Sequence, residues 1–96
     1  MQAEAAQNVA RRLSRIEGQV RGVKRLIEEG AYCCDILNQL NAARAALDQA
    51  SAIIAAEHIR HCIVGHDCGE GHAVAQQMTK EELLDELQDV LSRLVR

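Results

Sequence analysis

The residues with the clearest capacity for chemistry are Cys33, His58 and Cys62. His58 and Cys62 are four positions apart, so on a helix their side chains leave the same face. A thiolate and an imidazole at this spacing can share one metal ion, but two protein ligands rarely complete a site, and Cys33 is the candidate third. Two thiolates and one imidazole are a soft set that favours Cu(I), whereas Zn(II) wants a fourth ligand and Ni(II) a further nitrogen donor.

The position of Cys33 has a consequence for assembly. It precedes His58 by 25 residues on what the pattern predicts to be one continuous helix. At the rise of an α-helix the two positions are roughly 37 Å apart, so one chain cannot bring both to one ion. Two such helices packed antiparallel about a two-fold axis would place Cys33 of one chain beside His58 and Cys62 of the other. The helix length therefore predicts a dimer with two identical sites.

The other cysteines and histidines give weaker signals. Cys34 points about 100° away from Cys33 on a helix, so we expect it to pack as a small apolar residue. A further group within twelve residues could hold a secondary zinc or nickel ion: His61, His66, Cys68 and His72. Its spacing matches no standard motif, so a solvent-exposed polar loop is the favoured interpretation.

Three helices are expected to position these residues. Apolar side chains recur at three- and four-residue steps over about 3–29, and Gly30 follows as a helix-ending glycine. A second such pattern runs over about 32–63 with no breaker. The glycines between 65 and 71 predict a loop, and Thr79-Lys80-Glu81-Glu82 matches a capping box that starts a short third helix. The predicted fold class is all-α, with a single domain over 1–96.

The composition argues against a self-sufficient monomer. The 96-residue chain has one Tyr and no Phe, Trp or Pro, so its core must come from Leu, Ile, Val and Ala. A domain of this size buries only roughly 60–65% of its unfolded surface. We therefore expect an oligomer that completes its core with a partner chain.

Charge is distributed unevenly along the chain. The formal net charge is −3, yet the stretch from Arg11 to Arg25 holds six cationic residues against the single Glu17. Such a face suits nucleic-acid phosphates, although a charged helix face is more often only solvated. No apolar run could span a bilayer and no leader is visible, so we expect a cytoplasmic protein with reduced thiols and no membrane partner.

These segments together resemble the CsoR/RcnR family of bacterial metal-responsive repressors. The opening of the family resembles the run Arg11-Arg12-Leu13-Ser14-Arg15-Ile16-Glu17-Gly18-Gln19-Val20-Arg21-Gly22-Val23. Its first ligand region resembles residues 32–39, and its second resembles residues 57–62. The resemblance covers helices one and two. It implies three-helix protomers that form an antiparallel four-helix-bundle dimer and then a tetramer. It also implies repression of metal-export genes and release from operator DNA when the inducer binds.

The resemblance also assigns residues. In its copper-sensing branch the ligands match Cys33, His58 and Cys62. Tyr32 matches a residue beside the ligands that couples them to the DNA surface, and an acid expected on the third helix would be Glu81 or Glu82. The candidate DNA contacts are Arg11, Arg12, Arg15, Gln19 and Arg44.

Some residues depart from the copper-sensing branch. Arg44 resembles the nickel- and formaldehyde-sensing branches more closely, and the loop rich in Gly and His is not a copper-branch feature. The persulfide-sensing branch keeps the two cysteines but lacks the histidine, so His58 argues against it. The formaldehyde branch needs a Pro where Gln2 stands.

The function favoured by these observations is a repressor that binds operator DNA without metal and is released by Cu(I), derepressing copper-export genes. A nickel sensor or a thiol or persulfide sensor of the same family is the first alternative. A helical metal-storage or trafficking protein that never meets DNA is an alternative of another class. An enzyme is not expected, since no nucleophile–base pair, phosphate loop or open catalytic metal site is visible.

Overall fold

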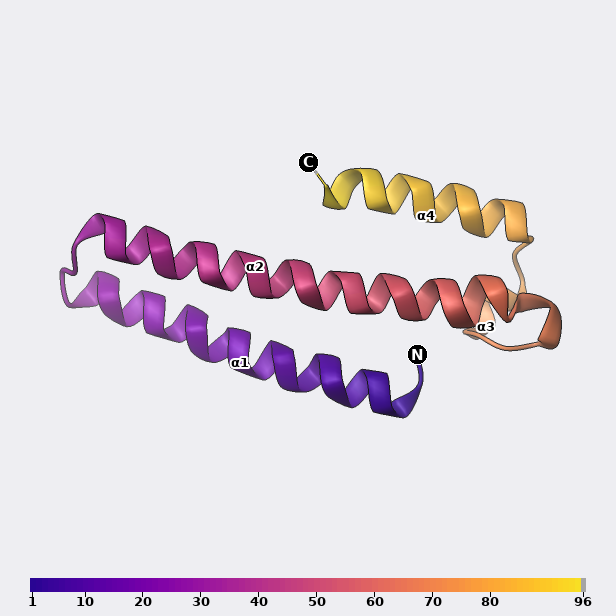
Figure 1. Ribbon diagram of the computed structural model, residues 1–96, viewed down its shortest axis with the longest axis horizontal. Coiled ribbons are helices and arrows are strands. Elements are labelled where there is room, and N and C mark those ends of the chain that lie inside the picture. The colour runs from indigo at the N-terminus through magenta and orange to yellow at the C-terminus, as the bar shows by residue number, and fades with distance from the viewer. Residues whose placement is uncertain (96) are drawn as a thin grey trace. The chain divides into compact units, whose positions relative to one another are not determined.

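Helices make up nearly all of the regular structure. The computed structural model describes residues 1–95, and Arg96 lies outside the described residues. The elements, in chain order, are α1 (Ala3–Glu28), α2 (Cys33–His58), the π-helix η1 (Ile59–Val64), the 3-10 turn η2 (His66–Cys68), α3 (Ala73–Gln76) and α4 (Lys80–Leu94) (Figure 1). These residues contain no strand, which confirms the all-α prediction. None of the described helices is both long enough and apolar enough to cross a membrane.

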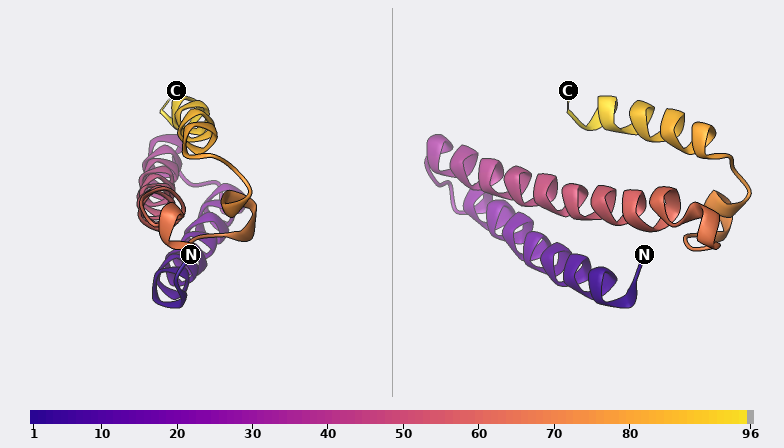
Figure 2. Two further views of the ribbon diagram at one scale, coloured as in Figure 1. Left: turned by 90° about the vertical axis from the view of Figure 1, so that its right-hand side faces the viewer. Right: turned by 45° about the vertical axis from the view of Figure 1, so that its right-hand side comes forward.

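The backbone forms two compact units, and the first, Gln2–Ile54, is a helical hairpin of α1 and most of α2 (Figures 1 and 2). The turn between the helices depends on Gly30, whose φ of 69° is in the left-handed region. The N–H of Gly30 donates to Ile27 O at 3.1 Å, and that of Ala31 donates to Leu26 O at 2.9 Å. These bonds form a Schellman motif, which confirms that Gly30 ends the first helix.

Only part of the apolar surface of the hairpin is covered within one chain. Its buried apolar side chains are Val9, Ile16, Val23, Ala43 and Ala50. Other members of the same stripes stay exposed: Leu13, Val20, Ile27, Leu37, Leu40, Leu47 and Ile54. Because they recur at helical steps of three and seven residues, they form a continuous apolar face rather than scattered exposed residues. One chain alone therefore leaves many of its apolar side chains exposed.

The apolar face includes a groove of about 680 Å³ between α1 and α2. The groove is lined by Leu13, Ile16, Val20 and Leu47, together with Glu17, Arg21 and Lys24. An apolar groove bordered by charged side chains is typical of a surface that another protein element covers.

The second unit, from Ala55 onward, is built around η1. This π-helix packs against η2, α3 and α4. The small core consists of Cys62, Ile63, Ala75 and Leu83, with Met78 and Leu87 packed against it. Leu83 of α4 is fully buried, so its side chain helps to anchor α4 to this core. Cys62 is thus a member of a core as well as a candidate ligand.

The structure differs from the predicted helices in two places. The second helix was expected as one α-helix over 32–63, but α2 ends at His58 and the chain continues as η1. The segment 65–72, expected as a loop, contains the turn η2, and the one-turn helix α3 follows it. The protomer therefore has one short helix more than the three predicted. Periodicity cannot reveal a single turn, because the signal needs a window of 11 or more residues.

The predicted capping box of α4 is confirmed. Thr79 Oγ1 accepts a hydrogen bond from the N–H of Glu82 at 3.1 Å, and Glu82 Oε1 accepts one from the N–H of Thr79 at 2.8 Å. The N–H of Thr79, and then its hydroxyl, stabilise the charged carboxylate and lower the pKa of Glu82. The box thus fixes where α4 begins.

Replacing Thr79 with Ala is expected to lower the free energy of unfolding by about 1 kcal/mol, because the first turn of α4 loses its side-chain acceptor. Urea denaturation followed by circular dichroism, at fixed protein concentration, measures the change. Thr79→Ser keeps the hydroxyl and serves as the matched control. Equal loss in both variants would contradict the role of the hydroxyl.

The contribution of Glu82 to the free energy of unfolding should decrease as the pH is lowered. Because its folded-state pKa is depressed, its stabilising effect is complete above its ordinary value of 4.5 and is lost as the pH falls through the lower folded-state value. Glu82→Ala should therefore destabilise the protein at neutral pH and have no effect at strongly acidic pH. A pH-independent difference between variant and wild type would show that the carboxylate charge is irrelevant.

Candidate metal centre and basic surface

The three candidate metal ligands stand at the two ends of α2. Cys33 is the first residue of the helix and is exposed, and His58 is the last and is half-buried. Cys62 lies beyond His58 in η1 and is buried. Among residues 1–95, no group of three or more His, Cys, Asp or Glu side chains is close enough to hold a metal ion. If these three residues share an ion, a second chain must supply part of the ligand set.

The helix changes type between His58 and Cys62. The π-helix η1 begins directly after His58, and the N–H of Gly65 donates to Arg60 O, five residues back, at 3.2 Å. Each residue of a π-helix turns by less than in an α-helix, so Cys62 is rotated from the position that the spacing alone suggests. Such π-turns are rare in proteins overall, but they occur often at functional sites.

The four cysteines differ in accessibility. Cys62 is only 6% exposed, whereas Cys33, Cys34 and Cys68 are exposed. Cys34 was expected to pack as a small apolar residue, and within the single chain this prediction is wrong. It lies in the first turn of α2, where the hairpin connection leaves the helix uncovered.

A buried acidic residue beside the candidate ligands was missed in the sequence. Glu57 is 8% exposed, and its Oε1 accepts a hydrogen bond from Arg60 at 2.9 Å. Its Oε2 lies 3.4 Å from Nε2 of His61, and neither atom makes a well-oriented hydrogen bond to another described residue. The two atoms lie close together without forming a hydrogen bond, even with each other. The i, i+4 spacing of Glu57 and His61 is a common helical pair and could have indicated the contact.

The candidates for a secondary metal site do not gather at one point. Each histidine ring has a partner of its own: His61 lies beside Glu57, His66 Nε2 is 2.7 Å from Met78 O, and His72 Nδ1 accepts from the N–H of Val74 at 3.1 Å. Cys68 is exposed. Within residues 1–95 these four side chains form no metal cluster. The side chains of His61 and His66 are only 16% and 18% exposed, so these two are not solvent-exposed loop residues.

The residues expected to support the ligands have distinct environments. Tyr32 directly precedes α2 and its side chain is 70% exposed. The carboxylate of Glu82 is occupied by the capping box. Glu81 is exposed and makes no side-chain hydrogen bond to the described residues. Of the two acids, Glu81 is the one whose carboxylate remains available to a partner.

Most candidate DNA contacts extend into solvent. The exposed ones are Arg11, Arg15, Gln19 and Arg44. Arg12 is half-buried and donates to Asn8 Oδ1 at 3.2 Å and to Gln49 Oε1 at 3.4 Å. Arg12 is thereby tied to α2 within the hairpin.

Candidate thiol and imidazole ligands near the ends of one long helix, with a basic helix preceding it, are features expected of a small helical metal-sensing regulator. A sequence model described as "metal-sensitive transcriptional repressor" matches residues 5–93. The chain belongs to this family, the CsoR/RcnR family, which confirms the resemblance noted in the sequence. Its members are regulators rather than enzymes.

Two curated relatives are copper sensors. The chain is 34% identical over 89 residues to the copper-sensing transcriptional repressor CsoR of Bacillus subtilis, a match that spans 92% of this chain and 79% of that protein. It is 48% identical over 56 residues to the copper-sensing repressor RicR of Mycobacterium tuberculosis. This second match spans 58% of each chain, which is less than two thirds of RicR.

Two solved structures share the fold. The copper-sensing repressor CsoR with Cu(I) from Geobacillus thermodenitrificans NG80-2 is 36% identical, with a TM-score of 0.81 over 100% of this chain and 92% of that one. The nickel-responsive regulator InrS is 38% identical, with a TM-score of 0.69 over 92% and 90%. Because these relatives respond to different metals, the fold alone does not select the ion.

The Glu57–His61 pair provides a test of the second unit. Glu57→Ala should lower the free energy of unfolding by about 1–3 kcal/mol, since it removes the hydrogen bond from Arg60 and the carboxylate that faces the buried His61 ring nitrogen. Glu81→Ala, at an exposed position, should change it by less than about 0.5 kcal/mol. Chemical denaturation at neutral pH compares the two. Removing His61 as well should recover part of the loss, and strict additivity in the double variant would contradict the coupling.

Proposed function

We propose that this protein is a Cu(I)-responsive transcriptional repressor that binds operator DNA in the metal-free form and leaves it when Cu(I) binds. The observation that carries the proposal is the donor set of Cys33, His58 and Cys62 in a chain of this repressor family. Two thiolates and one imidazole suit a soft ion that accepts few ligands. The copper-sensing relatives support the same choice of ion.

The site would be completed between two copies of the chain. His58 and Cys62 would meet the partner subunit's Cys33, because α2 holds Cys33 and His58 at opposite ends of 26 residues. The exposed apolar face of the hairpin supports this assembly, since a second copy would remove it from water. We propose a homodimer of this kind, pairing further into a homotetramer.

The link between the site and DNA would be mechanical. Cys33 begins α2, and Gln49 on the same helix receives a hydrogen bond from Arg12 of α1. When Cys33 is drawn toward its co-ligands, α2 shifts and the basic face of α1 shifts with it. Release requires that the ion bind the DNA-free form more tightly, and a coupling of about 1–3 kcal/mol would change affinity roughly 5- to 150-fold.

Nickel is the second candidate inducer, because the fold is shared with InrS. Ni(II) would prefer a further nitrogen donor, and no histidine occurs before His58. A persulfide or disulfide between Cys33 and Cys62 would make the protein a thiol sensor instead, but that chemistry does not require the imidazole of His58.

Anaerobic titration of the reduced protein with Cu(I), against a competing chromophoric chelator, should reveal one tightly bound ion per chain. His58→Ala should weaken the affinity by roughly tenfold or more, since one of three ligands is lost. His72→Ala is the matched control, because that imidazole caps α3 and stands outside the donor set. Weak binding, or equal loss in both variants, would reject the copper proposal.

Operator binding should depend on contacts between cationic side chains of α1 and the DNA phosphates. Fluorescence anisotropy with promoter DNA should show affinity falling steeply with salt, because phosphate contacts release counterions. Arg15→Glu should reduce affinity by roughly tenfold or more. Arg93→Glu in α4 changes the net charge equally and should have little effect. Salt-independent binding, or equal losses, would exclude the basic face of α1 as the DNA surface.

A further inference from the structure

The segment 65–72 after η1 folds back onto Cys62. A Cβ atom placed on Gly71 would lie 2.8 Å from His61 O, 2.9 Å from Cys62 Cα and 3.3 Å from Cys62 Sγ. Only a residue without a side chain allows this approach, and the φ of Gly71, +101°, also disfavours other residues. The backbone at Gly71 is therefore in direct contact with a candidate ligand.

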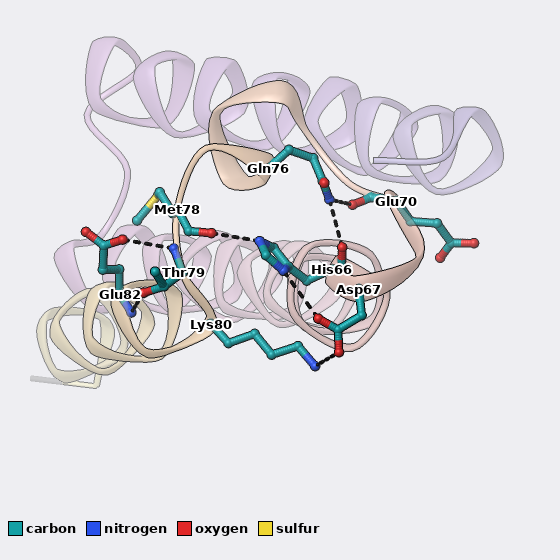
Figure 3. A network of polar contacts seen from close by, with 8 residues as sticks. All are labelled: His66, Asp67, Glu70, Gln76, Met78, Thr79, Lys80 and Glu82. Carbon is teal, nitrogen blue, oxygen red and sulfur yellow. Dashed lines mark hydrogen bonds and ion pairs between the residues drawn. The ribbon is translucent and has the colours of Figure 1, made fainter.

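Side-chain hydrogen bonds hold this segment in place (Figure 3). His66 Nε2 donates to Met78 O at 2.7 Å, which ties η2 to the residues leading into α4. Gln76 Nε2 donates to His66 O at 3.3 Å and also to Glu70 O. The same segment carries an exposed ion pair between Asp67 and Lys80, with 2.7 Å between Oδ2 and Nζ, which lowers the pKa of Asp67.

The remaining surroundings of Cys62 come from the small core. Ala75 of α3 and the fully buried Leu83 of α4 belong to the same cluster as Cys62. Segments from α3, α4 and 65–72 thus lie around Cys62, and Gly71 is the residue of 65–72 that approaches it. The chemistry of a thiol depends on access as well as on its charge.

We propose that residues 65–72, fastened by His66 and Gln76 and touching Cys62 through Gly71, form a fixed cover over the Cys62 thiol. The cover closes this side of Cys62 to solvent, oxidants and chelators. The effect of the cover on metal binding rests on the proposed function. If Cys62 binds the ion, the other ligands can reach that ion only from the uncovered side of Cys62. Gly71 and His66 are accordingly positioning residues, which act on the ion through Cys62.

The test is the alkylation rate of each cysteine in the reduced, metal-free, full-length protein. Iodoacetamide is added in limiting time steps, and peptide mass spectrometry quantifies each thiol. In the wild type Cys62 should react roughly tenfold or more slowly than Cys68, which serves as an internal reference. Gly71→Ala should raise the rate at Cys62 by roughly fivefold or more and leave that at Cys68 unchanged.

Gly69→Ala is the matched control. Gly69 also has a positive φ, 76°, but nothing lies within 4 Å of an added Cβ. It therefore reproduces the backbone strain without the contact to Cys62, and it should leave the Cys62 rate close to wild type. Equal acceleration in both glycine variants would overturn the assignment to Gly71.

His66 gives a second route if Gly71→Ala does not fold. His66→Ala should expose Cys62, and His66→Gln should restore protection, because its amide can donate to Met78 O. Asp67→Asn should have little effect, since exposed ion pairs contribute little. Fast labelling of Cys62 in the wild type, or no difference between the two His66 variants, would overturn the cover.

A final measurement separates this inference from the proposed function. In Cu(I)-loaded protein a chelator should remove the ion faster from Gly71→Ala than from Gly69→Ala, and equal rates would reject the effect on the metal. If the wild type binds no Cu(I), the proposed function fails, while the alkylation rates still decide whether the cover exists.

Discussion

Helix α2 runs for 26 residues from Cys33 to His58, with neither proline nor glycine to interrupt it. A rigid rod of this length keeps its two ends apart in every conformation of a single chain. The candidate ligands at and beyond its two ends could serve one ion only across two chains. The same rod connects the ligand positions to the hairpin that carries the basic face.

The hairpin buries only part of its own apolar surface. Its buried positions include small residues such as Ala43 and Ala50, while Leu37, Leu40 and Leu47 remain exposed. With almost no aromatic side chains, the chain has few large groups with which to fill a core of its own. The apolar face is thus better suited to a contact between chains than to a monomer core, which agrees with a ligand set divided between two chains.

The second unit surrounds Cys62, a buried thiol that is also a candidate metal ligand. A buried cysteine usually behaves as an inert small hydrophobe, and a ligand must remain reachable. The core around Leu83 fixes Cys62 from one side, and the backbone of Gly71 covers another. The π-helix and the buried Glu57 set the local geometry between the two candidate ligands of this unit.

Sequence patterns predict the features that depend on neighbouring residues. Helical periodicity, the ending at Gly30 and the capping box at Thr79 are local, so each was predicted correctly. The family was also evident from short motifs in the first two helices. Within the single chain Cys34 is exposed rather than packed as predicted, because burial depends on which elements lie nearby in space.

Contacts between positions far apart in the sequence are visible only in the folded chain. The hydrogen bond from Arg12 to Gln49 and the approach of Gly71 to Cys62 join residues through folding of the chain, and no local pattern encodes them. The π-helix after His58, which packs against α3 and α4, is likewise absent from the periodic pattern. Propensity is a weak preference of a fraction of a kcal/mol, roughly 0.7 at most for ordinary residues, and packing overrides it.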